Sequence, residues 1–202
     1  MTTGRRESPP SIGLTGSIGA GKSAALEAFA RHGAAVLESD RIVHALYDRA
    51  DVRDAVSERL GSAVRRVDGS IDRGRVAELV FAEPELRQWL EDLIHPLVEE
   101  ALIVWRDEQS ALVPAPVALV HEVPLLFETG AAERYDRTLV IAAPDPVRRA
   151  RVAARGALEG LERREQRLLP EAEKIALADD VIVNDGDLAA LDRAVATYLA
   201  AL

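Results

Sequence analysis

The sequence predicts a fold of the α/β class, with a three-layer α/β/α core built around a parallel sheet. Short apolar segments alternate with helical patterns along most of the 202-residue chain, which is typical of parallel strands buried on both faces. A glycine-rich motif stands between the first of these segments and the first helix. A long stretch of helical periodicity separates the second segment from the third, so we expect a helical subdomain inserted into the core.

Five short apolar segments are the predicted strands. They span residues 11–15, 33–37, 117–121, 138–142 and 181–183, and each is continuous and apolar, as buried parallel strands are. Ligands of such sheets bind at the carboxyl ends of the strands. The polar residues at those ends, Asp40, Glu122 and Asn184, are therefore candidates for a functional site.

The segment from Gly16 to Ser23 reads Gly-Ser-Ile-Gly-Ala-Gly-Lys-Ser and matches the phosphate-binding P-loop, G-x-x-x-x-G-K-[ST]. Its glycines allow backbone N–H groups to form a concave anion site at the start of a helix, expected here over residues 23–32. Lys22 would reach the β- and γ-phosphates, and the Ser23 hydroxyl would coordinate Mg²⁺. We therefore predict a P-loop NTPase core whose nucleotide-binding residues include Gly16, Ser17, Ile18, Gly19, Ala20, Gly21, Lys22 and Ser23.

Residues 41–116 form the predicted insertion, because this stretch has helical periodicity and no clear strand. A plain crossover between parallel strands needs fewer residues. Within the insertion, the helical pattern over residues 86–105 is interrupted at His95-Pro96, because a residue before proline avoids the α conformation. A single histidine is more often structural than catalytic, so we assign His95 to substrate binding or to the geometry of the subdomain. The last helix, over residues 188–202, is expected to be structural.

An arginine-rich stretch follows the fourth predicted strand. Its arginines are Arg148, Arg149, Arg151, Arg155, Arg163, Arg164 and Arg167. One interpretation is a solvated helix face paired with Glu159, Glu162 and Glu165. The other is a lid, over about residues 147–170, that closes arginine side chains over phosphates during transfer. We favour the lid for at least two of these arginines.

Phosphoryl transfer also needs a group that orients or deprotonates the acceptor. Asp40 ends the second predicted strand, which we expect beside the P-loop, and it could accept a proton from an acceptor hydroxyl or hold a metal-bound water, with Glu38 assisting. It could also simply cap a helix that begins at Arg41. Glu122 follows the third strand, where a carboxylate would interact with Mg²⁺ directly or through water. A loop salt bridge is the alternative for Glu122.

Composition narrows the class of protein. A formal net charge of −9 argues against a nucleic-acid-binding surface, which would show a basic patch. The chain has no cysteine and no apolar run long enough to span a membrane, so we expect a cytoplasmic protein. We also expect a monomer or a weak homo-oligomer. Residues 1–11 are polar and are expected to be a flexible extension. Residues 12–202 are expected to form one domain, with its core at about residues 12–40 and 117–202.

The order of the motifs resembles the dephospho-coenzyme A kinase family. The likeness begins with the P-loop segment 12–23 and continues through Glu38-Ser39-Asp40, Ile71-Asp72-Arg73, Val80-Phe81 and the segment 93–98 around His95-Pro96. It then includes Val123-Pro124-Leu125-Leu126-Phe127-Glu128, the spaced arginines Arg151 and Arg155, and a closing segment with Lys174, Ala178-Asp179 and residues 181–184. The P-loop alone is generic, whereas the His-Pro and Pro-Leu-Leu-x-Glu elements are specific. The resemblance covers nearly the whole chain, about residues 12–184.

This resemblance implies ATP-dependent phosphorylation of the ribose 3′-hydroxyl of dephospho-coenzyme A, the last step of coenzyme A synthesis, with Mg²⁺ bound together with ATP. It implies that Asp40 is the catalytic base and that Lys22 and Arg151 act in catalysis. It also implies ATP contacts from Arg155 and Asn184, and acceptor contacts from the helical subdomain and the loop after the third strand. The expected acceptor-binding residues are Asp40, Arg73, His95, Pro124 and Leu125.

The chain departs from the family pattern at five positions. Ser17 replaces a usual glycine and is tolerable only if its φ is below zero. Glu38 and Glu122 stand where aspartate is common, Leu168 where glutamine is usual, and Gly156 where aspartate often follows the second lid arginine. None of these departures removes Lys22 or Asp40, so we expect an active enzyme.

Three other interpretations remain open at this point. The chain could be a P-loop kinase for another small molecule, which a panel of substrates would decide. It could be a GTP-binding switch, although neither Lys22 nor Lys174 follows an asparagine, as the guanine-reading Asn-Lys-x-Asp element requires. It could also be an inactive binding module that retains the fold.

Overall fold

A computed structural model describes residues 8–166 and 168–202, apart from the side chain of Arg163. Most of the predicted N-terminal extension, together with Arg167 of the arginine-rich stretch, lies outside the described residues. The chain divides into two compact units. An α/β unit contains the chain up to Glu38 and Glu108–Leu202, and a helical unit contains Ser39–Asp107.

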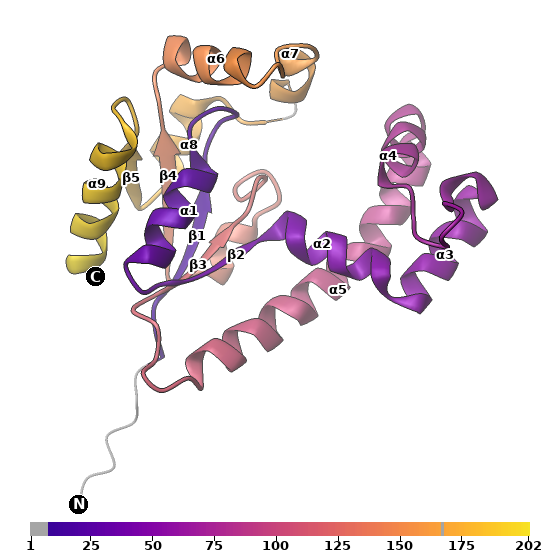
Figure 1. Cartoon of the computed structure of the whole chain (residues 1–202), viewed down its shortest axis with the longest axis horizontal. Helices are drawn as coiled ribbons and strands as arrows, with labels where there is room; N and C mark the ends of the chain where they lie inside the picture. The colour runs from indigo at the N-terminus through magenta and orange to yellow at the C-terminus, as the bar shows by residue number, and fades with distance from the viewer. Residues whose placement is uncertain (1–7, 167) are drawn as a thin grey trace, which may run out of the picture. The chain divides into compact units, whose positions relative to one another are not determined.

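The α/β unit is built on a five-stranded sheet in the order β2-β3-β1-β4-β5, in which every neighbouring pair is parallel (Figure 1). The strands are β1 (Ser11–Thr15), β2 (Ala35–Glu38), β3 (Leu119–Glu122), β4 (Arg137–Ala142) and β5 (Asp180–Val183). The predicted α/β class and parallel sheet are therefore confirmed. The strand order also corrects one expectation, because β3, and not β2, is a neighbour of the P-loop strand β1.

Six helical segments belong to this unit in the part of the chain that the structure describes: α1 (Lys22–Arg31), the 3₁₀ helix η2 (Ala131–Arg134), α6 (Asp145–Ala154), α7 (Leu161–Glu165), α8 (Glu171–Leu177) and α9 (Leu188–Ala200). Helices α1 and α9 pack against each other and contribute to the main apolar core. Ile12, Leu14, Phe29, Leu139 and Val195 are fully buried there. Side chains alternate between the two faces along a strand. Leu14 faces this core, so its register partner Glu122 on β3 lies on the same face of the sheet.

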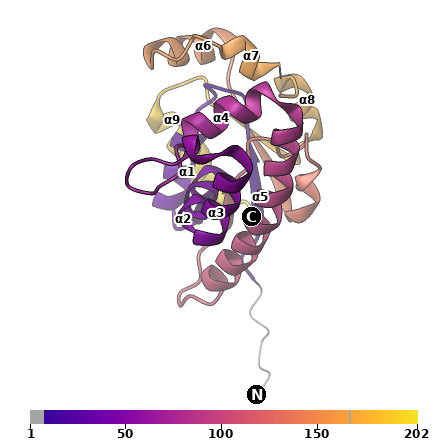
Figure 2. The same ribbon diagram turned by 90° about the vertical axis from the view of Figure 1, so that its right-hand side faces the viewer.

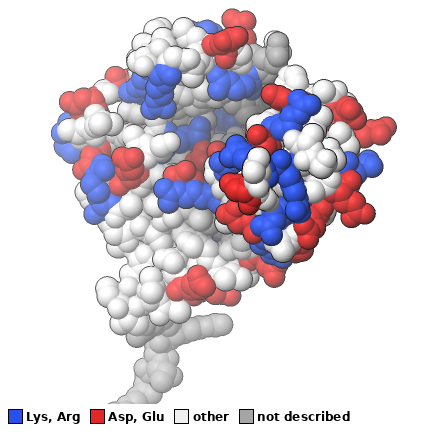
Figure 3. All heavy atoms as spheres, turned by 45° about the vertical axis from the view of Figure 1, so that its right-hand side comes forward, with Lys and Arg blue, Asp and Glu red and all other residues white. Residues whose placement is uncertain are grey.

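The helical unit begins with α2 (Ser39–Asp48) and α3 (Ala50–Leu60) and continues through the 3₁₀ helix η1 (Ser62–Val64), α4 (Arg73–Ala82) and α5 (Pro84–Ser110), whose last residues pass into the α/β unit (Figure 2). Its own buried residues include Leu46, Val52, Val56 and Val76. Its charges form exposed pairs such as Arg49–Asp51 and Arg75–Glu78, and Figure 3 shows basic and acidic side chains interspersed on this surface.

The predicted interruption at His95-Pro96 is wrong. Helix α5 continues through Pro96 for 27 residues, although proline removes one hydrogen bond from a helix interior and costs about 3 kcal/mol. The buried side chains Ile94 and Leu102 lie on either side of the proline, eight residues apart and hence on one helix face. Their packing holds both halves of the helix in line. No helix within residues 8–166 and 168–202 is long and apolar enough to cross a membrane.

Candidate active site

The P-loop joins β1 to α1, and close backbone approach explains its glycines. A Cβ on Gly16 would lie 2.3 Å from the carbonyl oxygen of Ile141 in β4. A Cβ on Gly19 would lie 2.7 Å from the carbonyl oxygen of Arg148 in α6, and one on Gly21 would lie 2.2 Å from Nδ2 of Asn184. Gly19 and Gly21 also have φ values of 83° and 102°, which side chains rarely adopt. The loop is therefore shaped by neighbours on its outer side.

Ser17, the departure within the motif, fits its position. Among the described residues only glycines have positive φ. Ser17 therefore has φ below zero, as the replacement of glycine requires. Its side chain is buried. The substitution therefore leaves the course of the P-loop unchanged.

Lys22 and Glu122 face each other at the carboxyl edge of the sheet. Nζ of Lys22 donates to the Gly16 carbonyl at 2.9 Å and lies 3.8 Å from Oε1 of Glu122. Glu122 is in register with Glu38 on β2, so both carboxylates project from the same sheet face. The salt bridge expected as the alternative role of Glu122 is therefore present, and its partner is the P-loop lysine.

The oxygen donors near the P-loop suit Mg²⁺ but do not form a complete cage. Ser23 lies in the first turn of α1 and is exposed, and Glu122 ends β3. In the described part of the chain, no group of three or more histidine, aspartate or glutamate side chains could hold a metal. Mg²⁺ keeps waters and binds through one or two protein oxygens plus phosphates in kinases, so a hydroxyl and a carboxylate are a fitting donor set.

Asp40 lies in the helical unit, two residues after the end of β2. Helix α2 begins at Ser39, so Asp40 is inside its first turn and does not cap a helix starting at Arg41. The carboxylate belongs to an exposed residue. Asp40 therefore stands at the connection between the two units, on the chain that leaves the carboxyl end of the sheet.

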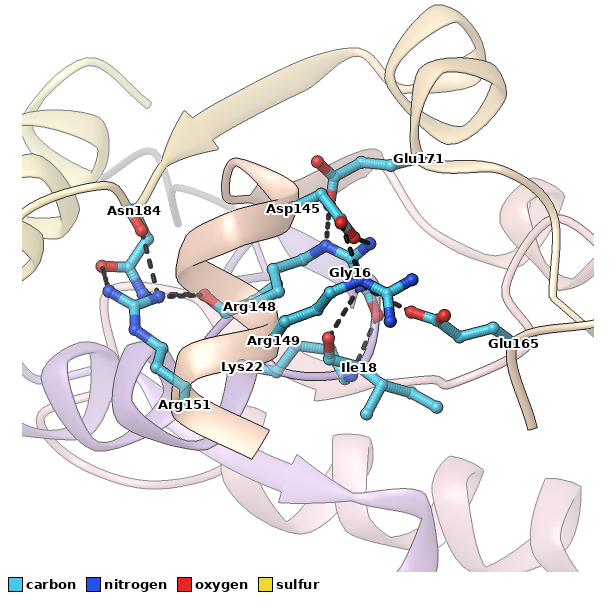
Figure 4. A network of polar contacts seen from close by, with 11 residues as sticks. Gly16, Ile18, Lys22, Asp145, Arg148, Arg149, Arg151, Glu165, Glu171 and Asn184 are labelled. Atoms are coloured by element: carbon cyan, nitrogen blue, oxygen red, sulfur yellow. Dashed lines mark hydrogen bonds and ion pairs between the residues drawn. The ribbon is translucent and has the colours of Figure 1, made fainter. Parts of the chain in front are cut away.

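Two arginines of α6 contact the outer side of the P-loop (Figure 4). Nη1 of Arg148 donates to the Ile18 carbonyl at 2.9 Å, and Nη1 of Arg151 donates to the Ala20 carbonyl at 3.3 Å. Asn184 donates from Nδ2 to the same Ala20 oxygen at 2.7 Å. The sequence grouped Arg148 with the other arginines and gave no signal that it reaches the P-loop.

The other described lid arginines are more exposed. Arg149 pairs with Asp145 at 2.8 Å, which raises the pKa of the arginine and lowers that of the aspartate through their hydrogen bond. Arg164 donates to the carbonyls of Gly160 and Ala157. Arg155 follows the end of α6 and is exposed. An acidic partner thus explains Arg149, whereas Arg148 both pairs with Glu165, as the solvated-face interpretation expected, and reaches the nucleotide-binding loop, as Arg151 does.

A buried ion pair joins the loop after β3 to helix α8. Lys174 is 0% exposed, and its Nζ lies 2.9 Å from Oε1 of Glu128 and 3.4 Å from the carbonyl oxygen of Pro124. Burial would raise the pKa of Glu128, but hydrogen bonds from the Leu169 N–H and from Lys174 lower it overall. Thr15, just before the P-loop, donates to the same Pro124 oxygen at 3.3 Å. The sequence placed Lys174 and Glu128 in the family pattern without pairing them.

The predicted acceptor-binding residues fall in two places. Arg73 opens α4 and His95 lies on α5, both exposed in the helical unit. Pro124 and Leu125 lie in the loop after β3, where Leu125 is 39% exposed. Each set is accessible within its own unit.

Comparison with known proteins gives a consistent result. The sequence model of a family described as dephospho-CoA kinase matches residues 11–190. The chain is 41% identical over 198 residues to the dephospho-CoA kinase of Aromatoleum aromaticum, covering 94% of each chain, and 39% identical to that of Methylococcus capsulatus, covering 91% of this chain and 92% of that protein.

Two solved structures are similar along nearly their whole length. Protein TT1252 from Thermus thermophilus has a TM-score of 0.82 and 36% sequence identity, covering 97% of this chain and 99% of that one. The dephospho-CoA kinase from Campylobacter jejuni has a TM-score of 0.70 and 25% identity, covering 94% and 95%.

Proposed function

The chain belongs to the dephospho-CoA kinase family, and we propose that it transfers the γ-phosphoryl group of ATP to the ribose 3′-hydroxyl of dephospho-coenzyme A, which completes coenzyme A synthesis. The observation that carries the proposal is the complete P-loop of a chain that matches this family over residues 11–190. The GTP-switch interpretation has no such support. We place the reaction in the cytoplasm, where ATP is available.

The P-loop side of the site supplies positive charge and positioning. Backbone N–H groups of the P-loop bind the phosphates, and Lys22 can move from the Gly16 carbonyl and Glu122 to the β- and γ-phosphates. Ser23 and Glu122, the latter directly or through water, would hold Mg²⁺, which neutralises charge that develops on the phosphates. Arg151 acts from its place against the Ala20 carbonyl, and Arg155 and Asn184 complete the ATP contacts.

Asp40 is the proposed base. The 3′-oxygen of the acceptor forms the new bond to the γ-phosphorus as the bond from that phosphorus to the β,γ-bridging oxygen breaks. The hydroxyl proton passes to the Asp40 carboxylate, and ADP leaves. Arg73 and His95 of the helical unit, with Pro124 and Leu125 after β3, are the proposed acceptor contacts.

The direct test measures ATP consumption with and without dephospho-coenzyme A and determines the position of the new phosphate. We expect consumption to depend on the acceptor and the phosphate to be on the 3′-oxygen. ATP consumption that does not depend on this acceptor, or that requires another small molecule, would contradict the proposal.

Asp40→Asn tests the base. Removing a general base typically costs about 10²–10⁴-fold in rate, so we expect kcat to fall in that range with little change in the affinity for ATP. Asp48→Asn is the matched control, because Asp48 is an exposed aspartate at the other end of α2. Unchanged activity in Asp40→Asn would show that another group accepts the proton.

A further inference from the structure

Arg148 is embedded between the P-loop and the helices α7 and α8. Its side chain is only 11% exposed. Nη1 donates to the Ile18 carbonyl at 2.9 Å and to Oε1 of Glu165 at 2.8 Å, and Nη2 donates to Oδ1 of Asp145 at 2.7 Å. Nε lies 3.8 Å from Oε2 of Glu171. Three carboxylates therefore surround one guanidinium (Figure 4), so Arg148 is committed to protein groups.

The contact with Ile18 has a geometric consequence for the P-loop. A trans peptide unit is planar, and its C=O and N–H point in opposite directions. The Ile18 carbonyl shares a peptide plane with the N–H of Gly19. Arg148 holds this oxygen on the side of the loop that faces α6, which turns the Gly19 N–H to the opposite side of the loop. Arg151 and Asn184 hold the Ala20 carbonyl, which orients the N–H of Gly21 in the same way.

The packing of α6 makes this orientation rigid. The missing side chain of Gly19 leaves room for the backbone of Arg148, because a Cβ there would lie 2.7 Å from the Arg148 carbonyl oxygen and 3.0 Å from Cγ2 of Val152. Val152 is buried. The helix that supplies the arginine therefore touches the P-loop at the peptide unit that the arginine holds.

We propose that Arg148 is a positioning residue for nucleotide phosphate binding: it fixes the Ile18–Gly19 peptide so that the Gly19 N–H faces the phosphates. The positive charge also polarises the peptide unit, since hydrogen bonds in a chain strengthen one another. The three carboxylates hold the guanidinium in place and keep it from binding the phosphates itself. This inference rests on the nucleotide role of the P-loop in the proposed function, and it does not depend on the identity of the acceptor.

Arg149 provides a matched control. It is the next residue on the same helix and shares the partner Asp145. Its side chain is 47% exposed, and its Nε donates to Asp145 Oδ2 at 2.8 Å instead of to the P-loop. Arg149→Met removes the same charge from α6 without touching the Ile18 carbonyl.

The test compares the binding of ADP and of adenosine to Arg148→Met by calorimetry or competition. Adenosine lacks phosphates, so a change in the anion site formed by the P-loop N–H groups affects only ADP binding. Loss of a hydrogen bond from a charged donor predicts an ADP Kd about tenfold higher or more, with adenosine binding and the KM for the acceptor within about twofold of the unaltered chain. Arg149→Met should leave all three unchanged, and Arg148→Lys, which keeps one charged donor, should recover most of the ADP affinity.

Two results would overturn the proposal. One is normal ADP binding by Arg148→Met. The other is an equal loss of ADP and adenosine binding, which would indicate a structural role only. Should the stranded carboxylates prevent Arg148→Met from folding, adding Glu165→Gln and Glu171→Gln removes two of the three charges, and Asp145 keeps Arg149 as its partner. The same ADP-selective loss is then expected. Because no acceptor is needed, a failure here is distinct from a failure of the proposed transfer reaction.

Discussion

The two units of the chain place their polar groups differently. Apart from Tyr47 of the helical unit, the polar and charged residues of the described chain that are buried as whole residues lie in the α/β unit: Thr15, Ser17, His121, Glu122, Thr138, Lys174 and Asn184. The helical unit instead carries its ion pairs at the surface, as in Arg75–Glu78, whose side chains are 51% and 68% exposed. A buried polar group is stable only with fixed partners, so the α/β unit holds its groups in one geometry. Exposed charges remain available to a ligand.

The largest effect predicted by this contrast is on the buried pair Lys174–Glu128. Lys174→Met leaves the Glu128 carboxylate, only 14% exposed, without its cation. Breaking one side of a buried pair costs about 3–5 kcal/mol, so we expect the free energy of unfolding to fall by that amount in chemical denaturation.

A matched exposed pair gives the comparison. Arg87→Met removes one partner of the Arg87–Glu91 pair in α5, whose side chains are 51% and 43% exposed, and exposed pairs contribute about 0–1 kcal/mol. Equal losses of stability in the two variants would remove the distinction between the units.

A second prediction concerns ligand binding by the helical unit. If its exposed charges serve the acceptor, Arg73→Ala should raise the KM for dephospho-coenzyme A roughly 10- to 100-fold, since hydrogen bonds to charged groups are among the stronger ones. Tm should be nearly unchanged. Arg75→Ala, two residues along α4 and paired with Glu78, is the control and should leave KM unaltered. The same increase in both variants would indicate a general effect of surface charge.

The smallest predicted effect is on two exposed helix caps, one in each unit. Asp72 accepts from the Arg75 N–H at the start of α4, and Asp187 accepts from the Ala190 N–H at the start of α9. Alanine at either position should lower Tm by roughly 2–4 °C in thermal unfolding. A much larger loss from Asp187→Ala would mean that membership of the α/β unit, and not burial, determines the cost.

The sequence predicted the sheet and the P-loop well because their signals are local. Each strand is a short apolar run, and the motif fixes the course of residues 16–23 by the type and spacing of its residues. Strand order is not a local property. β3 lies between β1 and β2, and this pairing cannot be predicted from the sequence of any one strand. Pro96 misled the prediction because buried neighbours in α5 outweighed the local preference of proline.

The sequence named candidate site residues one by one but not the contacts between them. Lys22 and Glu122 were named separately. They are 100 positions apart in the chain, and their contact depends on the register of β1 and β3. Arg148 and Arg149 are indistinguishable by composition, yet the direction of a helix face sends one to the P-loop and the other to solvent. Such differences arise only from tertiary packing.

The close fit of α6 against Gly19 also limits how a lid formed by the arginine-rich stretch could move. Arg148 and Arg151 donate hydrogen bonds to carbonyls of the P-loop, and Gly19 has no room for a methyl group beside the Arg148 carbonyl oxygen. The first two turns of α6 are therefore held against the P-loop, and a closing motion of the predicted lid would have to hinge farther along, beyond Arg151. Arg155, exposed just after the helix ends, would be the first arginine that such a motion carries toward the phosphates.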